Sequence, residues 1–272
     1  MQLAPMQELG YVASLFIGIS LGLIGGGGSI LTVPVLVYLF SVNPVLSTSY
    51  SLFIVGSTSL VGAINNYRQD AVRIKVALLF GITSVTTVFI TRKFIMPFIP
   101  ENLFTIGSYT ITHSIVTMVL FAVLMIVAAN AMIKNGDTVK EDVVSKSKIN
   151  LPKLLIYGIA VGLATGLLGA GGGFLLIPTL VLFVGLPMKE AVGTSLLIIA
   201  LNSLIGFTGD IGHFNIDWVF LAIITGIAIA GIFIGDLVSK KVEGEKLKKI
   251  FGWFVMIMGI YILISEFFLS IY

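Results

Sequence analysis

Ten apolar segments follow one another along the chain, separated mostly by short polar connections. They fall near residues 9–24, 29–41, 45–65, 74–99, 109–133, 153–168, 173–186, 190–209, 217–239 and 250–269. Several reach the roughly 20 residues that a helix needs to cross the hydrocarbon core of a bilayer. Only 11% of the 272 residues are charged, and the mean hydropathy is +1.09. This pattern predicts an all-α integral membrane protein that crosses the bilayer several times.

The second half of the chain repeats the first at a shift of 144 residues. Residues 18–62 align with residues 162–206 without a gap, with 16 identities in 45 positions. The matched positions include Gly22, Gly25, Gly27, Gly28, Leu31, Pro34, Ser51 and Ser59 with Gly166, Gly169, Gly171, Gly172, Leu175, Pro178, Ser195 and Ser203. Shared membrane composition does not place proline and serine in register. We therefore expect two transmembrane repeats of about five helical segments, residues 1–133 and 153–272, joined by a polar linker over residues 134–152.

Lysine and arginine gather on one side of the expected membrane. With the linker in the cytoplasm, alternation of the segments places fourteen of the 16 basic residues on the cytoplasmic side, and only Arg92 and Lys93 fall outside. The same alternation puts the loop at 66–73 inside and its repeat partner at 210–217 outside. This predicts two inverted-topology repeats, both termini outside, and 8–10 membrane segments.

Each repeat opens with a glycine-broken hairpin. The first break is Gly25, Gly26, Gly27, Gly28 and Ser29, and the second is Gly169, Ala170, Gly171, Gly172 and Gly173. The segments that follow, 29–41 and 173–186, are too short to span the membrane comfortably. A half-helix that begins at Ser29 or Gly173 directs unpaired N–H groups and a positive dipole end at the break, which favours an anion. We expect the two breaks to meet and bind substrate; the alternative is that the glycines only allow close helix packing.

Polar side chains recur in the helix that follows each break. Ser51 and Thr58 lie seven residues apart in the first repeat, and Ser195 and Asn202 do so in the second. This spacing puts each pair on one helix face, where these groups and Thr194 can complete the coordination of an oxyanion. The alternative is that such hydroxyls bond carbonyls of their own helix or join neighbouring helices.

Charged residues are expected near the ends of the spans and not in the middle. Asp236 precedes Lys240 by one helical turn, which predicts a local ion pair. Asp210, His213 and Asp217 cluster in the outer loop of the second repeat, as a gate or as a solvated turn. There is no cysteine, and no nucleophile, base or metal cluster lies at membrane depth, so we expect neither an enzyme nor a bound cofactor or metal.

The glycine-rich break followed by proline in each half, with Gly-Thr-Ser-Leu at 193–196, resembles the TauE/SafE family of sulfite and organosulfonate exporters. The first repeat departs from this pattern with Ser-Tyr-Ser-Leu at 49–52. The resemblance implies a secondary carrier for small sulfur-containing anions, such as sulfite, sulfoacetate or thiosulfate, in a prokaryotic cytoplasmic membrane.

These observations together predict transport of a small anion by alternating access. The alternatives are an anion channel and a carrier of another small anion, such as a carboxylate. The expected partners are the anionic substrate and membrane lipid, with no nucleic acid. A coupling ion, either a proton or sodium, and an oligomeric assembly are both compatible with the sequence.

Overall fold

The computed structural model describes residues 3–100, 102–106, 109–134, 151–168 and 173–269. The first half contains α1 (Leu3–Ile24), α2 (Gly27–Pro34), α3 (Pro44–Tyr67), α4 (Ile74–Ile90), β1 (Asn102–Ile106), β2 (Tyr109–Thr112) and α5 (His113–Lys134). The second half contains α6 (Leu151–Leu168), α7 (Gly173–Pro178), α8 (Met188–Asp210), α9 (Trp218–Ser239) and α10 (Gly244–Leu269). Short π-helical turns extend α2 over Val35–Leu39, α4 over Thr91–Ile95 and α7 over Thr179–Phe183. The helical elements match the predicted apolar segments closely.

The helix starts follow from local sequence. Asn43 precedes α3, and its side-chain oxygen accepts a hydrogen bond from the N–H of Val45, while Pro44 occupies the first helical turn. Asp217 caps α9 in the same way, by accepting from the N–H of Phe220. Between α1 and α2, Gly25 has a φ of +73°, a conformation that glycine adopts without steric cost. The chain can therefore reverse at the first break.

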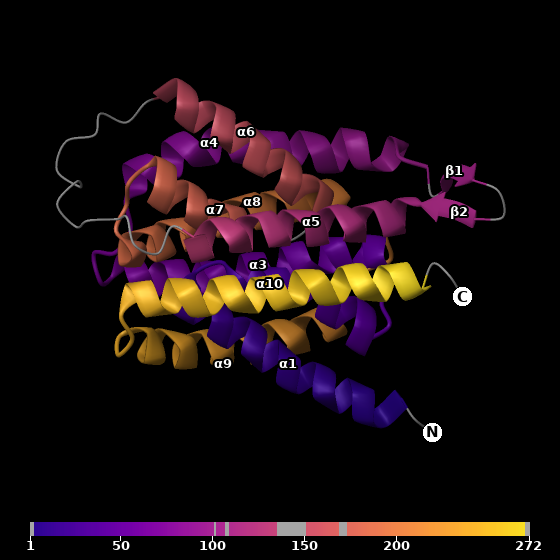
Figure 1. The fold of residues 1–272 in the computed structure, drawn as a ribbon, viewed down its shortest axis with the longest axis horizontal. Helices are drawn as coiled ribbons and strands as arrows, with labels where there is room; N and C mark the ends of the chain where they lie inside the picture. The colour runs from indigo at the N-terminus through magenta and orange to yellow at the C-terminus, as the bar shows by residue number, and fades with distance from the viewer. Residues whose placement is uncertain (1–2, 101, 107–108, 135–150, 169–172, 270–272) are drawn as a thin grey trace.

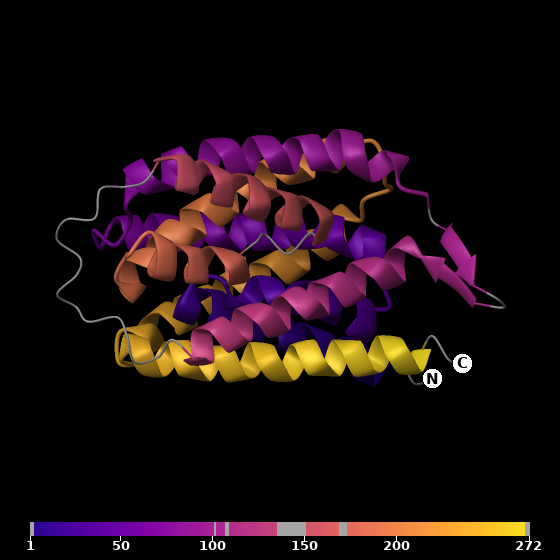
Figure 2. The ribbon, with the colours of Figure 1, turned by 45° about the horizontal axis from the view of Figure 1, so that its top comes forward.

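The helices lie side by side along the long axis of the molecule (Figures 1 and 2). Helix α1 packs along α9, α10 along α5, and α4 along α6, while α3 and α8 pack against each other. Within an apolar 18-residue stretch of each helix, 67% of the residues are buried in α3 and 72% in α8, against 39% in each of α1, α4 and α9. The polar helices α3 and α8 are thus the centre of the protein.

Glycines allow two of these helix pairs to approach closely. A Cβ on Gly18 of α1 would overlap the carbonyl oxygen of Ala228 in α9. At the position 144 residues later, a Cβ on Gly162 of α6 would lie 2.6 Å from the carbonyl oxygen of Ser84 in α4. Small residues at such contacts are typical of membrane helices. Each repeat thus packs its first helix against a long helix of the other repeat.

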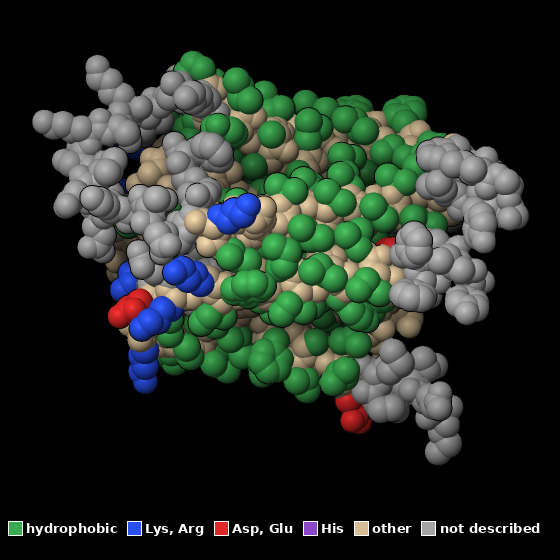
Figure 3. Space-filling model, in the orientation of Figure 1, with side chains coloured by type: hydrophobic (Ala, Val, Ile, Leu, Met, Phe, Trp, Pro, Cys, Tyr) green, Lys and Arg blue, Asp and Glu red, His purple; other side chains and the backbone are tan. Residues whose placement is uncertain are grey.

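The described surface is apolar around the middle of the protein. Figure 3 shows hydrophobic side chains across this middle region, and a group of Lys and Arg side chains near the end where α10 begins. Exposed large apolar residues include Leu78, Ile82, Val123, Val127, Phe233, Leu237, Trp253 and Ile257. Five described helical stretches are long and apolar enough to cross a membrane: Gln7–Ile24, Pro44–Tyr67, Ile74–Phe98, Met188–Asp210 and Trp218–Ser239. The protein is an all-α, multi-pass membrane protein.

One short β-hairpin departs from the helical pattern. Strands β1 and β2 pair antiparallel, with Thr105 opposite Thr110 and Ile106 opposite Tyr109. The apolar segment predicted at 109–133 therefore begins as a strand and becomes helical only at His113. Short apolar runs rich in threonine and isoleucine do not by themselves distinguish strand from helix.

Candidate functional site

The first glycine break meets Gly173, the last residue of the second break, in the interior. A Cβ on Gly26 would overlap the carbonyl oxygen of Gly173, and a Cβ on Gly173 would lie 2.7 Å from Cα of Gly26. Helix α2 begins at Gly27 and α7 begins at Gly173, so the starts of the two half-helices are in backbone contact. Four further members of the predicted site, residues 169–172, lie outside the described residues.

Two predicted serines lie at this contact. Ser29 is fully buried, and its hydroxyl donates to the carbonyl of Gly26 at 2.7 Å. Ser195, also fully buried, donates to the carbonyl of Val192 at 2.8 Å and of Gly25 at 3.2 Å, which joins α8 to the first break. Both hydroxyls are donors, as an anion site requires. Both currently donate to backbone carbonyls.

The other predicted side chains have different surroundings. Thr58 donates to the carbonyl of Ile54 in its own helix at 2.7 Å, and Thr194 accepts a hydrogen bond from the backbone N–H of Arg73 at 2.9 Å. Thr58 is thus held by its own helix, while Thr194 fixes the start of α4.

Two buried polar groups keep free hydrogen-bonding capacity. Asn202 accepts from the hydroxyl of Ser84 at 2.8 Å through Oδ1, whereas its Nδ2 has no partner among the described residues. The hydroxyl of Ser51 also has none there. Ser51 is the repeat equivalent of Ser195, whose hydroxyl donates to Gly25. The residue equivalent to Gly25 is Gly169, which lies outside the described residues.

Two cavities lie at opposite ends of the described structure. The basic-end cavity has a volume of about 260 Å³, and the strand-end cavity of about 640 Å³. The basic-end cavity is lined by Leu23, Asn66, Gln69, Ala71, Met188, Lys189, Val192, Asp236, Ser239, Lys240 and Val242. The strand-end cavity is lined by Asn43, Val45, Leu46, Arg92, Met96, Pro97, Ile99, Thr112, His113, Asp210, His213 and Phe214. Gly26 and Gly173 line neither of them.

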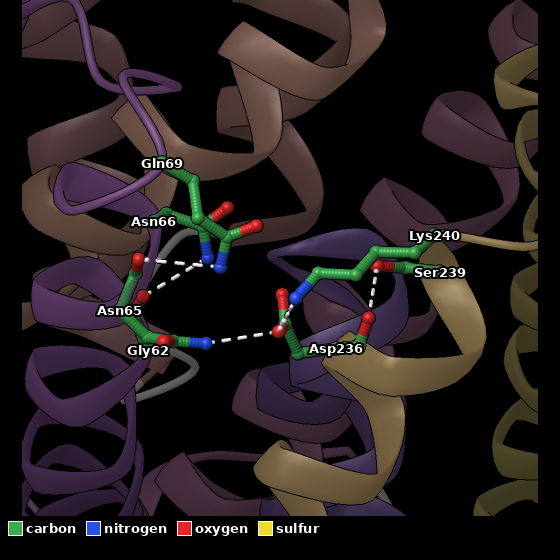
Figure 4. A network of polar contacts seen from close by, with 7 residues as sticks. All are labelled: Gly62, Asn65, Asn66, Gln69, Asp236, Ser239 and Lys240. Carbon is green, nitrogen blue, oxygen red and sulfur yellow. Dashed lines mark hydrogen bonds and ion pairs between the residues drawn. The ribbon is translucent and has the colours of Figure 1, made fainter.

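The basic-end cavity contains a polar network that joins α3 to α9 (Figure 4). The Nδ2 of Asn65 donates to Oδ2 of Asp236 at 2.9 Å, and Nζ of Lys240 lies 3.0 Å from the same oxygen. The predicted ion pair between Asp236 and Lys240 is confirmed. Asn66 donates to the carbonyl of Gly62 at 2.9 Å. Asp236 therefore has two donors at the rim of this cavity.

The strand-end cavity contains a buried ion pair that the sequence did not reveal. Nη1 of Arg92 lies 3.2 Å from Oδ2 of Asp210 and donates to Oγ1 of Thr48 at 3.0 Å. Arg92 is 1% exposed and Asp210 is 2% exposed. Asp210 is the last residue of α8 and is not solvated, while His213 and Asp217 are exposed.

The 144-residue shift between the repeats could have drawn attention to Arg92 and Asp210 in the sequence. It relates Arg92 to Asp236 and Asn66 to Asp210, so both cavities carry a charged residue at the same position of their repeat. The 45-position alignment stops just before Asn66 and Asp210, and Arg92 lies close enough to a span end to be taken for a loop residue.

The same shift relates two hydrogen bonds between α3, α8 and the helices that follow them. The N–H of Arg73 donates to Thr194, and the N–H of Asp217, 144 residues later, donates to the hydroxyl oxygen of Tyr50 at 2.8 Å. Tyr50 and Thr194 are themselves 144 residues apart. The contact between the repeats is therefore reciprocal at these two hydrogen bonds. Separately, Arg73 forms a two-point ion pair with Glu190, which raises the pKa of the Arg73 guanidinium.

Comparison with known proteins agrees with this architecture. The family described as "Sulfite exporter TauE/SafE" matches residues 11–262. A probable membrane transporter protein of Xylella fastidiosa (strain 9a5c) is 27% identical over 252 residues, which is 91% of each chain. The probable membrane transporter protein YdhB of Bacillus subtilis is 27% identical over 80% of this chain and 84% of its own. No solved structure matches. The resemblance seen in the glycine breaks is confirmed, and this chain belongs to the TauE/SafE family.

Proposed function

We propose that this protein is a secondary transporter that moves a small sulfur-containing oxyanion or organosulfonate, of the sulfite, sulfoacetate or thiosulfate class, by alternating access. The observation that carries the proposal is the buried contact between the starts of α2 and α7 at Gly26 and Gly173. The family to which the chain belongs is described as sulfite exporters, which supports the choice of substrate class.

The contact favours an anion for electrostatic reasons. The first N–H groups of a helix have no partner within it, and the helix dipole adds a partial positive charge there. Here two such starts face each other in the protein interior, with the hydroxyls of Ser29 and Ser195 beside them. Half-helix starts that meet between two repeats bind anionic groups in other secondary transporters.

Reciprocal packing supports inverted repeats. A Cβ on Gly62 would meet Ile232 and Leu196, and a Cβ on Gly206 would meet Val88 and Leu52, which are the same contacts shifted by 144 residues. Two copies related in this way can exchange conformations, which opens one end of the protein while the other closes.

The first break lies beside a residue that lines the basic-end cavity. A Cβ on Gly25 would lie 2.8 Å from the carbonyl oxygen of Val192, a residue that lines that cavity. At the strand end, the buried Arg92–Asp210 pair lines the other cavity. We place the basic end in the cytoplasm of a prokaryotic cell, because lysine and arginine favour that side, and both termini outside. The contact at Gly26 then has its nearest described cavity on the cytoplasmic side.

A carrier fits this arrangement better than a channel does. Conduction through a channel needs a continuous polar path, whereas the two described cavities lie at opposite ends and neither is lined by Gly26 or Gly173. A saturable flux with substrate counterflow is expected in proteoliposomes. A flux that stays linear with concentration and shows no counterflow would favour the channel.

The experiment that tests the site compares glycine and serine variants in proteoliposomes loaded with sulfite, thiosulfate or sulfoacetate. Gly173→Ala places a methyl group against the backbone of Gly26, and Ser195→Ala removes the hydroxyl beside Gly25, so both are expected to reduce transport at least tenfold with retained folding. Gly226→Ala is the matched control, because nothing lies within 4 Å of its Cβ position. Transport at the wild-type rate in both site variants would overturn the proposal.

A further inference from the structure

Arg92 is a fully buried cation that uses only part of its hydrogen-bonding capacity. Its side chain is 0% exposed, and Nη1 serves both Thr48 and Asp210. Its Nε and Nη2 have no partner among the described residues. Leaving charged donors unpaired away from water costs more than leaving neutral ones, so these two nitrogens favour binding an acceptor.

The open groups are the pair that arginine uses to bind a planar oxyanion. Nε–H and Nη2–H point the same way and match two oxygens of one acidic group. Arg73 in this chain shows the geometry, because its Nε and Nη2 donate to the two carboxylate oxygens of Glu190 at 2.6 Å each. Arg92 leaves the same fork without a partner among the residues that the structure describes.

A cavity large enough for such a ligand lies beside Arg92, while Nε and Nη2 are themselves buried in this conformation. Arg92 lines the strand-end cavity of about 640 Å³ together with the polar residues Thr112, His113 and His213. Met96, Pro97 and Phe214 add apolar surface. Asp210 is the carboxylate among the described lining residues, and it is engaged by Nη1.

The charge of this region favours a small monoanion. Arg92 and Asp210 together are neutral, so a ligand of single negative charge adds the least uncompensated charge to the cavity. Lys93, the neighbouring cation, is exposed and lies over the ring of Phe89 at 5.3 Å from its centroid. Arg92 itself lies on a π-helical turn, a local irregularity that often marks a functional position.

We propose that the strand-end cavity is a second anion site, in which Nε and Nη2 of Arg92 hold two oxygens of a sulfonate or carboxylate whose apolar body lies against Met96 and Phe214. The site is distinct from the glycine breaks and stands without them. It rests on the proposed function only for the choice of a sulfonate as the probe. It gives the strand end a place where substrate binds before or after it occupies the breaks.

The test is calorimetric titration of the purified full-length protein with ethanesulfonate, a monoanion with a short apolar body. Arg92→Lys keeps the charge and removes the fork, and it is expected to weaken the strand-end site at least tenfold. The double variant Arg92→Gln/Asp210→Asn is expected to lose this site while remaining folded, because it leaves no buried charge unpaired. Lys93→Gln, which removes the adjacent exposed charge, is the matched control and is expected to bind as the wild type does.

Several results would overturn this site. One is that the wild type shows no Arg92-dependent binding of ethanesulfonate. Another is that both Arg92 variants bind ethanesulfonate with the affinity and stoichiometry of the wild type. Native mass spectrometry separates a lipid from a free anion: a phospholipid retained by the wild type, lost from the double variant and not displaced by ethanesulfonate would assign the fork to a lipid phosphate. Failure of the proposed function gives another pattern. Transport then survives Ser195→Ala, whatever the Arg92 titration shows.

Discussion

The two ends of this protein are built from equivalent positions but differ in their electrostatics. At the basic end, Asp236 meets Asn65 and Lys240, and the Lys240 side chain is 51% exposed. At the strand end, Arg92 meets Asp210, and these side chains are 0% and 3% exposed. Water therefore screens the first network and is excluded from the second. The backbone contacts are alike in the two repeats, but the charged contacts differ. The polar contact between α3 and α9 at the basic end is easy to break, whereas the ion pair between Arg92 and α8 at the strand end is costly to break.

The largest expected effect is at the strand end. Arg92→Ala leaves Asp210 buried without its cation, which should lower the free energy of unfolding by about 3–5 kcal/mol. Denaturant titration in detergent, followed by circular dichroism, measures the loss. The neutral pair Arg92→Gln/Asp210→Asn should recover most of it. A loss below about 1 kcal/mol for the single variant would show that water reaches Asp210 once Arg92 is removed.

The next effect compares the helix contacts of the two repeats. Gly18→Ala places a methyl group on the Ala228 carbonyl, and Gly162→Ala places one at 2.6 Å from the Ser84 carbonyl, so each should cost about 1–3 kcal/mol of stability. Thermal unfolding of both variants measures this cost. Gly226→Ala, with no neighbour within 4 Å, should instead be neutral or stabilise the helix by up to about 1 kcal/mol. If only one of the two contact variants is destabilised, the two contacts are not equivalent.

A smaller effect is expected at the reciprocal hydrogen bonds. Thr194→Val removes the acceptor for the N–H of Arg73, and Tyr50→Phe removes the acceptor for the N–H of Asp217. Each should cost about 1 kcal/mol, the usual net value of one hydrogen bond. Hydrogen exchange at the starts of α4 and α9 reports the local loosening. An unequal loss of protection in the two variants would show that these two hydrogen bonds are not equivalent.

The smallest expected effect is at the basic end. Lys240→Gln removes one partner of Asp236 and should change stability by less than about 1 kcal/mol, because Asn65 remains and the lysine is half exposed. The difference from the wild type should shrink further as salt rises from low to about 1 M. Chemical denaturation at both salt concentrations measures it. A loss as large as that of Arg92→Ala would contradict the comparison.

The sequence predicted the helical segments, the family and the two glycine breaks, because these depend on apolar run length and on repeated glycine and proline. It did not predict β1 and β2, because runs as short as Asn-Leu-Phe-Thr-Ile and Tyr-Thr-Ile-Thr do not by themselves distinguish a strand from other structure. Nor did it predict the burial of Arg92, because local hydropathy places an arginine near a span end at the surface. Only a partner from another helix, Asp210, makes that burial tolerable, and such a pairing is not visible in local composition.

The contact between Gly26 and Gly173 has a mechanical consequence. Two backbones that already touch leave no space between them, so an anion bound there, as proposed above, would have to drive the half-helices apart. One half-helix belongs to each half of the chain, and a bound anion would therefore displace both halves at once. The size of the anion would then set the amplitude of the movement, and an ion too small to separate the two backbones would not produce it.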